Sequence, residues 1–254
     1  MSHRIKTILP VVMIFVFSGA LAYSIFGIIN WQQDSSATQD IVEEVQEIAT
    51  TPDDPEPNND DPAESEPTPT YELNFPKLLT INSQTIGWIS VPGTNIDYPY
   101  VQTDNNDYYL THSFDYTPNS AGWVFMDYRN KSDFSHKNTI IYAHGRYDKT
   151  MFGSLSTLLN KSWKANLNKN ITTLTPTGSY IWEVFSVYHI PTTSDYLRIN
   201  FSGDKDFTDF INTLKSRSAY DLGVSMSATD RILTLSTCYN KSEKLVVHAK
   251  LISN

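Results

Sequence analysis

The sequence from residue 71 to residue 254 predicts a mainly β fold, either a barrel or a sandwich, with few helices. Short stretches rich in β-branched, aromatic and other apolar residues recur along it, and turn residues such as the P-G-T-N run at Pro92 separate them. Only three segments carry apolar residues at helical spacing. A length of roughly 180 residues is comfortable for one hydrophobic core.

The elements follow in chain order from these patterns. We expect strands at 86–91, 96–101, 122–126, 139–143, 171–174, 180–190, 231–238 and 245–252. We expect helices at 75–82, 151–159 and 206–218.

The N-terminal region predicts a membrane anchor. Residues 1–6, with Arg4 and Lys6, form a basic flank, and residues 7–30 contain no charged residue and are long enough to cross a hydrocarbon core. The positive-inside rule then places residues 1–6 in the cytoplasm and the rest of the protein outside the cell. A cleaved signal peptide is the alternative, because Ala20-Leu21-Ala22 resembles a cleavage site, but the apolar run continues beyond it.

Residues 31–70 predict an extended stalk between the anchor and the β domain at 71–254. The segment is acidic, and after Thr51 it is rich in proline and has no core-forming residues, a composition typical of disorder. Ile41, Val45 and Ile48 are the exception, since they fall on one face of a short helix.

The net charge of -9 is concentrated in this stalk. It holds twelve of the 28 acidic residues and no Lys or Arg, so the rest of the chain is close to neutral. Without a basic face, the sequence does not suggest a nucleic-acid partner.

The only cysteine, Cys238, is the main candidate for chemistry. It ends one predicted strand, after Ser236 and Thr237, and a turn containing Lys241 leads to the next strand at Lys244. Such a thiol is accessible and close to positive charge, which favours a nucleophile. Because free cysteine is also common as a buried core residue, the position alone leaves both interpretations open.

A cysteine nucleophile needs an imidazole to exchange protons with the substrate. Among the six histidines, His144 stands out because it directly follows the strand N-T-I-I-Y-A and so projects from a strand end, as Cys238 does. The other five are expected to be surface or structural residues, or to lie on the cytoplasmic side.

Several segments resemble the sortase family, most closely class B. They are G-W-I-S-V-P-G-T-N-I-D-Y-P-Y-V-Q from Gly87, N-D-Y-Y-L from Asn106, A-G-W-V-F-M-D-Y-R-N from Ala121, N-T-I-I-Y-A-H-G from Asn138, M-F-G-S-L from Met151 and T-L-S-T-C from Thr234. The resemblance implies a closed eight-stranded β-barrel and a membrane-anchored cysteine transpeptidase of Gram-positive bacteria. It implies no cofactor and no metal.

The resemblance also assigns roles to residues. Cys238 corresponds to the family nucleophile and His144 to the family histidine. The family arginine that begins the next strand is replaced by lysine, either Lys244 or Lys241, and lysine lacks the planar guanidinium fork. We expect Ser236, Thr237 and Tyr142 to contact the substrate.

The implied reaction cleaves the C-terminal sorting signal of surface proteins after a threonine, through a thioacyl enzyme. The protein is then transferred to an amine of a peptidoglycan precursor. A pilin polymerase and a sortase-fold binding protein without activity remain alternatives, the second because of the missing arginine. A papain-like hydrolase is disfavoured, because His144 precedes Cys238 in the chain.

Overall fold

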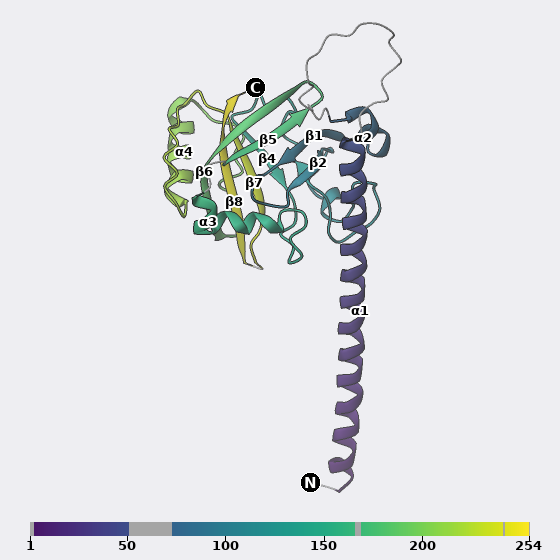
Figure 1. Cartoon of the computed structure of the whole chain (residues 1–254). Helices are drawn as coiled ribbons and strands as arrows, with labels where there is room; N and C mark the ends of the chain where they lie inside the picture. The colour runs from purple at the N-terminus through teal and green to yellow at the C-terminus, as the bar shows by residue number, and fades with distance from the viewer. Residues whose placement is uncertain (1–2, 51–72, 166–168, 241, 254) are drawn as a thin grey trace, which may run out of the picture.

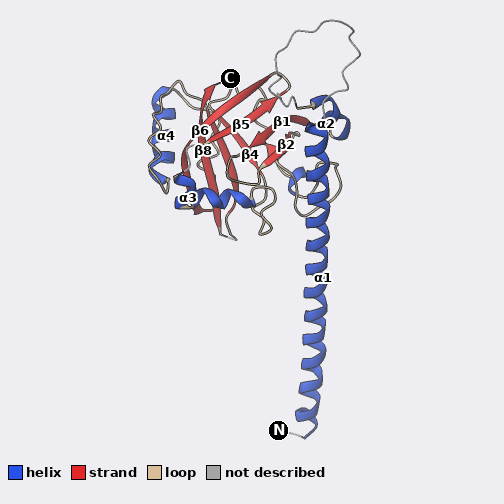
Figure 2. Cartoon of the chain, in the orientation of Figure 1, coloured by secondary structure: helices blue, strands red, loops and turns tan. Residues whose placement is uncertain are grey.

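The computed structural model describes residues 3–50, 73–165, 169–240 and 242–253. It shows a β-barrel with a few short helices, and a long N-terminal helix that runs along one side of the barrel and extends well beyond it (Figure 1). Strands are confined to the barrel (Figure 2).

Helix α1 extends from His3 to Thr50. Its large apolar side chains between Val11 and Ile29 are exposed, and within the described chain this is the helix that is long and apolar enough to cross a membrane. It is therefore a candidate membrane span, in the segment where the sequence predicts one.

Helix α1 does not end at residue 30. Residues 31–50, which the sequence predicts as the first part of a disordered stalk, are helical as well. The helix continues to Thr50, because residues 34, 38, 41, 45 and 48 form one stripe that packs on the barrel side of the protein, with Thr38, Val45 and Ala49 buried. Residues 51–70 of the predicted stalk lie outside the described residues. The division into tail, anchor, stalk and catalytic domain remains a prediction.

The β domain begins with helix α2 (Phe75–Ile81), which packs beside α1. Asn74 caps its first turn by accepting a hydrogen bond from the Lys77 backbone amide, and Pro76 occupies the early position where proline costs no backbone hydrogen bond.

Eight strands close into the barrel that the resemblance implied. They are β1 (Thr85–Ser90), β2 (Asp97–Val101), β3 (Phe125–Met126), β4 (Asn138–Tyr142), β5 (Asn170–Thr175), β6 (Gly178–Pro191), β7 (Ile232–Cys238) and β8 (Glu243–Ser253). Their order around the barrel is β1-β2-β3-β4-β7-β8-β6-β5. Each corresponds to a stretch predicted from the sequence, so the closed mainly β fold is confirmed.

The pairing of β4 with β7 fixes the functional edge of this barrel. The two strands are parallel, and Asn138 pairs with Ile232 while Tyr142 pairs with Ser236. Parallel strands end at the same edge of a sheet. His144, two residues beyond β4, and Cys238, the last residue of β7, therefore emerge side by side.

Short helices complete the domain: η1 (Tyr108–Leu110), η2 (Gly153–Leu159), α3 (Lys161–Lys164) and α4 (Asp204–Arg217). The helix predicted at 151–159 is a 3-10 helix, and the one predicted at 206–218 is α4. Phe207, Phe210, Ile211 and Leu214 of α4 are buried in a second apolar cluster with Phe185 of β6 and Val246 of β8.

His248 lies in the core under this helix. Its ring is fully buried between Tyr188, whose hydroxyl is 2.9 Å from Nε2, and Thr234, whose hydroxyl is 2.9 Å from Nδ1. Burial, together with the positive charge of Arg217, lowers the pKa of His248 from its usual 6.5 to about 3. The ring is therefore a neutral structural group.

This buried histidine predicts acid sensitivity. Between pH 6.5 and about 3 the unfolded chain binds a proton at His248 that the folded chain does not. The free energy of unfolding should therefore fall as the pH is lowered, by up to about 1.4 kcal/mol per pH unit from this group. In His248→Gln the protein should be less stable at pH 7 but lose stability less steeply below pH 6.5. Urea unfolding followed by tryptophan fluorescence measures both, and equal acid slopes would contradict this assignment.

Candidate active site

Cys238 is the exposed end of an otherwise buried strand. Residues 232–237 of β7 are buried, whereas Cys238 is open to solvent. In the antiparallel register of β7 with β8, Cys238 lies opposite Lys244, and the Lys244 ammonium donates a hydrogen bond to the Cys238 sulfur at 3.1 Å. This contact places a positive charge directly against the sulfur atom of the candidate nucleophile.

The structure thus brings Lys244 to the thiol. Lys241, the other cation that the sequence offered for the family arginine, lies outside the described residues.

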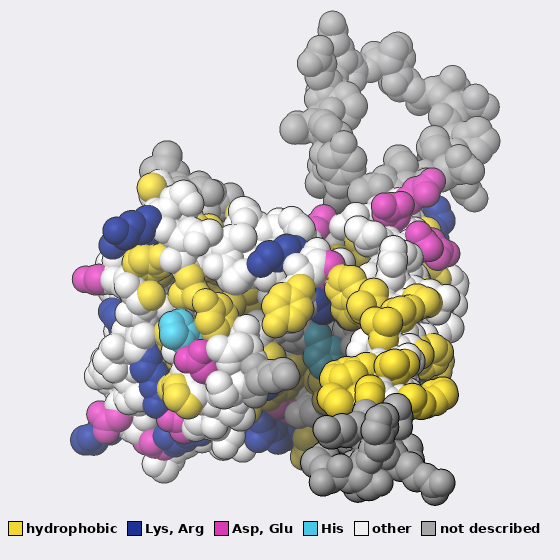
Figure 3. All heavy atoms as spheres, turned by 90° about the horizontal axis from the view of Figure 1, so that it is seen from below, with side chains coloured by type: hydrophobic (Ala, Val, Ile, Leu, Met, Phe, Trp, Pro, Cys, Tyr) yellow, Lys and Arg dark blue, Asp and Glu magenta, His cyan; other side chains and the backbone are white. Residues whose placement is uncertain are grey.

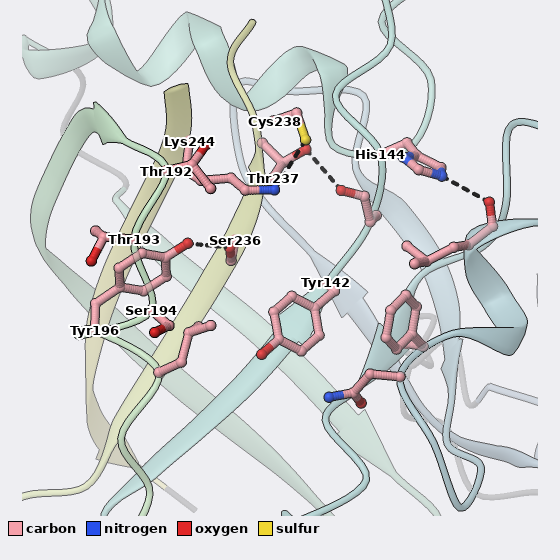
Figure 4. A pocket seen from close by; sticks show the side chains of 15 residues that line it. Tyr142, His144, Thr192, Thr193, Ser194, Tyr196, Ser236, Thr237, Cys238 and Lys244 are labelled. Atoms are coloured by element: carbon pink, nitrogen blue, oxygen red, sulfur yellow. Dashed lines mark hydrogen bonds between the residues drawn. The ribbon is translucent and has the colours of Figure 1, made fainter. Parts of the chain in front are cut away.

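His144 reaches the same edge from β4. Its Nε2 is 2.8 Å from the Leu110 carbonyl oxygen, and because a carbonyl only accepts, Nε2 carries the proton. The other ring nitrogen, Nδ1, is then left to exchange a proton with a reacting group. Figure 4 shows His144 across the mouth of the pocket from Cys238 and Lys244, without a direct hydrogen bond among these three described residues except that from Lys244 to Cys238.

A pocket of about 630 Å³ opens beside these groups. Its floor is formed by the ends of β4 and β7, and the loop after β6 forms one wall (Figure 4). The lining includes the three predicted substrate contacts, Tyr142, Ser236 and Thr237. Whether they contact a substrate remains a prediction.

The hydroxyl groups of these three residues are already hydrogen-bonded within the protein. Ser236 Oγ lies 3.0 Å from the Tyr196 hydroxyl, and Thr237 Oγ1 donates to the Ala143 carbonyl at 2.7 Å. Tyr142 donates to Asp127 at 2.9 Å. The bond from Thr237 ties the end of β7 directly to the residue before His144, so it holds the two candidate catalytic strands at a fixed spacing.

Asp127 and Tyr142 form a charged support behind the pocket. Burial would raise the pKa of the Asp127 carboxyl, but hydrogen bonds from Arg129 and Tyr142 outweigh it and lower that pKa. Burial and the adjacent Asp127 raise the pKa of Tyr142. Tyr142 therefore stays a hydroxyl donor, and its ring remains as the surface facing the pocket.

Sequence reasoning missed much of the pocket wall. The structure adds three groups of lining residues, which are Asn106 and Leu110 near η1, Phe125 of β3, and the loop residues Thr192, Thr193, Ser194, Tyr196 and Leu197. The loop after β6 has no apolar periodicity that would identify it as part of a binding site. Asn106 and Leu110, by contrast, belong to the N-D-Y-Y-L segment, which is one of the motifs that resemble the family.

Gly145 was also missed, although it follows His144 directly. A Cβ atom there would stand 2.0 Å from the Cys238 carbonyl oxygen and 3.0 Å from Thr237 Oγ1. The end of β7 thus packs directly against the backbone of Gly145. Gly122 is similar, since it has φ +61° and a Cβ there would meet the Tyr109 carbonyl at 2.4 Å and His144 Cδ2 at 3.1 Å.

Within the described part of the chain, no group of three or more His, Cys, Asp or Glu side chains is arranged to hold a metal ion. The chemistry that this site can perform with its own groups is acyl transfer through the thiol, with an imidazole for proton exchange and an ammonium for negative charge.

These features agree with what comparison with known proteins shows. Residues 89–252 match the model of the sortase domain, and the chain therefore belongs to the sortase family, whose members are cysteine transpeptidases. Its relatives include sortase B from Listeria monocytogenes, which is 36% identical over 180 residues that cover 69% of this chain and 73% of the relative. Sortase B from Staphylococcus aureus is 37% identical over 182 residues, covering 70% and 74% of the two chains.

A solved structure supports the same conclusion. Sortase B from B. anthracis, in complex with AAEK1, superposes with a TM-score of 0.73 at 33% identity and covers 87% of this chain and 99% of its own. The class B resemblance seen in the sequence motifs is therefore confirmed.

The close packing at Gly145 yields a prediction. Gly145→Ala should push the end of β7 away from the His144 loop, because the added methyl group would overlap the Cys238 carbonyl oxygen of the backbone. We expect a loss of about 1–3 kcal/mol in stability and at least a tenfold loss of activity. Thermal unfolding and turnover measure these effects. Gly178→Ala is the matched control, since its nearest atom would be 3.8 Å away. Wild-type behaviour of Gly145→Ala would disprove the packing argument.

Proposed function

We propose that this sortase cleaves a C-terminal sorting signal after a threonine and transfers the protein to an amine of a peptidoglycan precursor. The observation that carries the proposal is the exposed Cys238 thiol at the mouth of an apolar pocket, with the Lys244 ammonium 3.1 Å away and His144 at the same edge. The pocket volume of about 630 Å³ lies within the usual range of ligand-binding pockets.

In the first step, the Cys238 thiolate attacks the threonine carbonyl carbon. A C–S bond forms and the carbonyl oxygen becomes negatively charged. The peptide C–N bond then breaks as His144, which carries a proton on both ring nitrogens at this stage, donates the Nδ1 proton to the departing amine. A thioester on Cys238 and a neutral His144 remain.

In the second step, an acceptor amine attacks the thioester carbon. His144 accepts the proton that the amine nitrogen loses, the new amide C–N bond forms and the C–S bond breaks. Cys238 leaves as a thiolate, and both catalytic residues return to their starting states.

Lys244 stabilises negative charge in both steps. At rest it donates to the sulfur, and when negative charge moves to the carbonyl oxygen the flexible lysine stem lets the ammonium follow it. Arginine would offer two parallel hydrogen bonds to the same oxygen, whereas lysine offers a mobile point charge. The contact with the sulfur supports a catalytic role over a non-catalytic binding protein.

The N-terminal helix supports a location at the cell membrane. Its exposed apolar residues suit a single membrane span, and the basic residues Arg4 and Lys6 before it support a cytoplasmic amino terminus with the barrel outside. The substrates would then meet the enzyme on the outer face of that membrane.

The proposal predicts a covalent intermediate. Full-length protein in detergent, mixed with a library of sorting-signal peptides, should gain the mass of an N-terminal peptide fragment on Cys238. Hydroxylamine should remove it, because it cleaves thioesters. Intact-mass spectrometry detects the adduct, and Cys238→Ala should show none. A folded wild-type protein that binds peptides but forms no adduct with any of them would favour the binding-protein alternative.

The role of Lys244 predicts a graded loss of rate. Lys244→Ala should slow thioester formation by about 10² to 10³, the usual cost of removing one group that stabilises an oxyanion. Lys244→Arg should keep the rate within about tenfold, because the positive charge stays beside Cys238. Single-turnover acylation measures these rates. Lys205→Ala on the exposed face of α4 is the control, and an equal effect of Lys244→Ala and Lys205→Ala would exclude Lys244 from the reaction.

A further inference from the structure

A short face of α1 contacts the segments on both sides of His144. It consists of Trp31, Asp34, Ser35 and Thr38, which are spaced by three or four residues and therefore lie on one side of the helix. These four residues form the contact face of α1. Figure 3 views the molecule from the N-terminal end of α1 and shows apolar side chains gathered around the projecting helix beside the barrel.

The first contact is with the turn at 119–122, which precedes β3. The Asp34 carboxylate accepts hydrogen bonds from the Ser120 backbone amide, at 3.2 Å, and from the Ser120 hydroxyl. The Asn119 side-chain amide donates to the Asp34 carbonyl and to the Thr38 hydroxyl, each at 3.2 Å. Both Asn119 and Thr38 are buried, so this contact is part of the protein interior.

The same turn supports the ring of His144. A Cβ atom at Gly122 would lie 3.1 Å from His144 Cδ2 and 3.1 Å from the carbonyl carbon of Leu110. The turn therefore touches both partners of the hydrogen bond between His144 Nε2 and the Leu110 carbonyl (Figure 4). That bond leaves Nδ1 for the reaction, so the position of the turn determines where the reacting nitrogen lies.

The second contact is with the loop that follows His144. Ser35 donates to the Asp148 carboxylate at 2.8 Å and accepts a hydrogen bond from the Arg146 guanidinium. That guanidinium also lies 5.6 Å from the centre of the Trp31 ring. Arg146 and Asp148 form an ion pair at 2.9 Å, in which the Arg146 side chain is only 7% exposed. Ser35 thus completes a largely buried cluster that begins two residues after His144.

The charges of this cluster are stable. Burial would raise the pKa of Asp148, but hydrogen bonds from Arg146, Thr150 and Ser35 outweigh it and lower that pKa to about 2. The carboxylate therefore stays ionised in the neutral range. The contact with α1 is thus unchanged while the candidate catalytic groups exchange protons.

Two features make His144 dependent on such support. Strand β4 ends at Tyr142, so His144 lies beyond the ladder of strand hydrogen bonds that holds Cys238 opposite Lys244. The His144 carbonyl accepts a hydrogen bond from the Phe152 amide at 3.0 Å, which closes the loop on itself. A displacement at residues 146–148 therefore reaches His144.

The helix does not need the contact face to stay docked. Farther along α1, Val45 and Ala49 are buried in the same apolar cluster as Leu78 of α2 and Tyr98 of β2. The contact face instead buries polar groups, which cost free energy unless they are paired in a defined geometry. A face of this composition suits the orientation of its partners more than the attachment of the helix.

We infer that the contact face of α1 positions His144 for proton transfer, with Asp34 and Ser35 as positioning residues. The inference rests on the proposed function. Asp34 holds the segment before β3 and Ser35 holds the loop after β4, and the imidazole is supported by both. Positioning of this kind affects the rate strongly, because a displacement of about 1 Å at a reacting group costs about 10² in rate.

The rate of thioester formation is the first test. In full-length protein in detergent, Asp34→Ala combined with Ser35→Ala should lower kcat by about tenfold or more. KM should stay within about twofold, because the described lining of the first pocket contains no residue of α1. Ser36→Ala on the exposed side of the same helix is the matched control. Ser35→Thr, which keeps the hydroxyl, should restore most of the rate that Ser35→Ala loses.

The imidazole itself gives a second readout. Nitrogen NMR of protein with isotope-labelled histidine shows which ring nitrogen carries the proton, and His144→Gln identifies the signal of His144. The wild type should show the proton on Nε2, where the Leu110 carbonyl holds it. The double variant should show a mixture of both tautomers, because the ring is no longer held against that carbonyl. Ser36→Ala should match the wild type.

The possible failures are distinguishable. A double variant that is less stable but keeps the wild-type kcat and His144 signal would show that the contact face is only structural. A lower kcat with an unaltered His144 signal would also overturn the inference, because the rate would be lost elsewhere. If the wild type forms no thioester, the proposed reaction fails, and the His144 signal alone decides whether the ring is positioned by α1. Ser35→Ala alone carries the same tests if the double variant does not fold.

Discussion

The parallel pairing of β4 with β7 is the constraint on which the active site depends. Two residues separated by 94 positions in the sequence reach one edge because His144 lies just beyond the end of β4 and Cys238 is the last residue of the neighbouring parallel strand β7. The antiparallel turn from β7 to β8 then sets Lys244 opposite Cys238. Three candidate catalytic side chains are thus placed by backbone hydrogen bonds of the barrel, which are far more rigid than a loop would be.

Side-chain hydrogen bonds refine this arrangement. Thr237 joins the end of β7 to Ala143, and the Leu110 carbonyl fixes the proton of His144 on Nε2. Gly145 lets these two segments approach to a distance that a methyl group would forbid. The residues around the thiol therefore act largely through the backbone, and their small or polar side chains are required by close packing as much as by contact with a substrate.

The sequence was sufficient for the elements of the fold and for the central chemistry. Each strand has a local signature of alternating or β-branched residues, and a lone cysteine and a histidine at strand ends can be seen without a structure. The pocket wall after β6 was not predictable, because it is irregular and acquires its role only through tertiary contact. The length of α1 beyond residue 30 was predicted only in part, for a related reason: acidic residues dominate the composition there, whereas a stripe through Thr38, Val45 and Ala49 decides the packing.

That extension of α1 changes how the β domain is held relative to the candidate membrane span. A disordered stalk would let the barrel explore many orientations, whereas a continuous helix with Ser35 bonded to Asp148 holds it in one. The contact is made on the loop next to His144, so one continuous helix joins the candidate membrane span to the candidate active site. A thiol held in this way keeps one orientation relative to the helix, which a disordered connection would not give it.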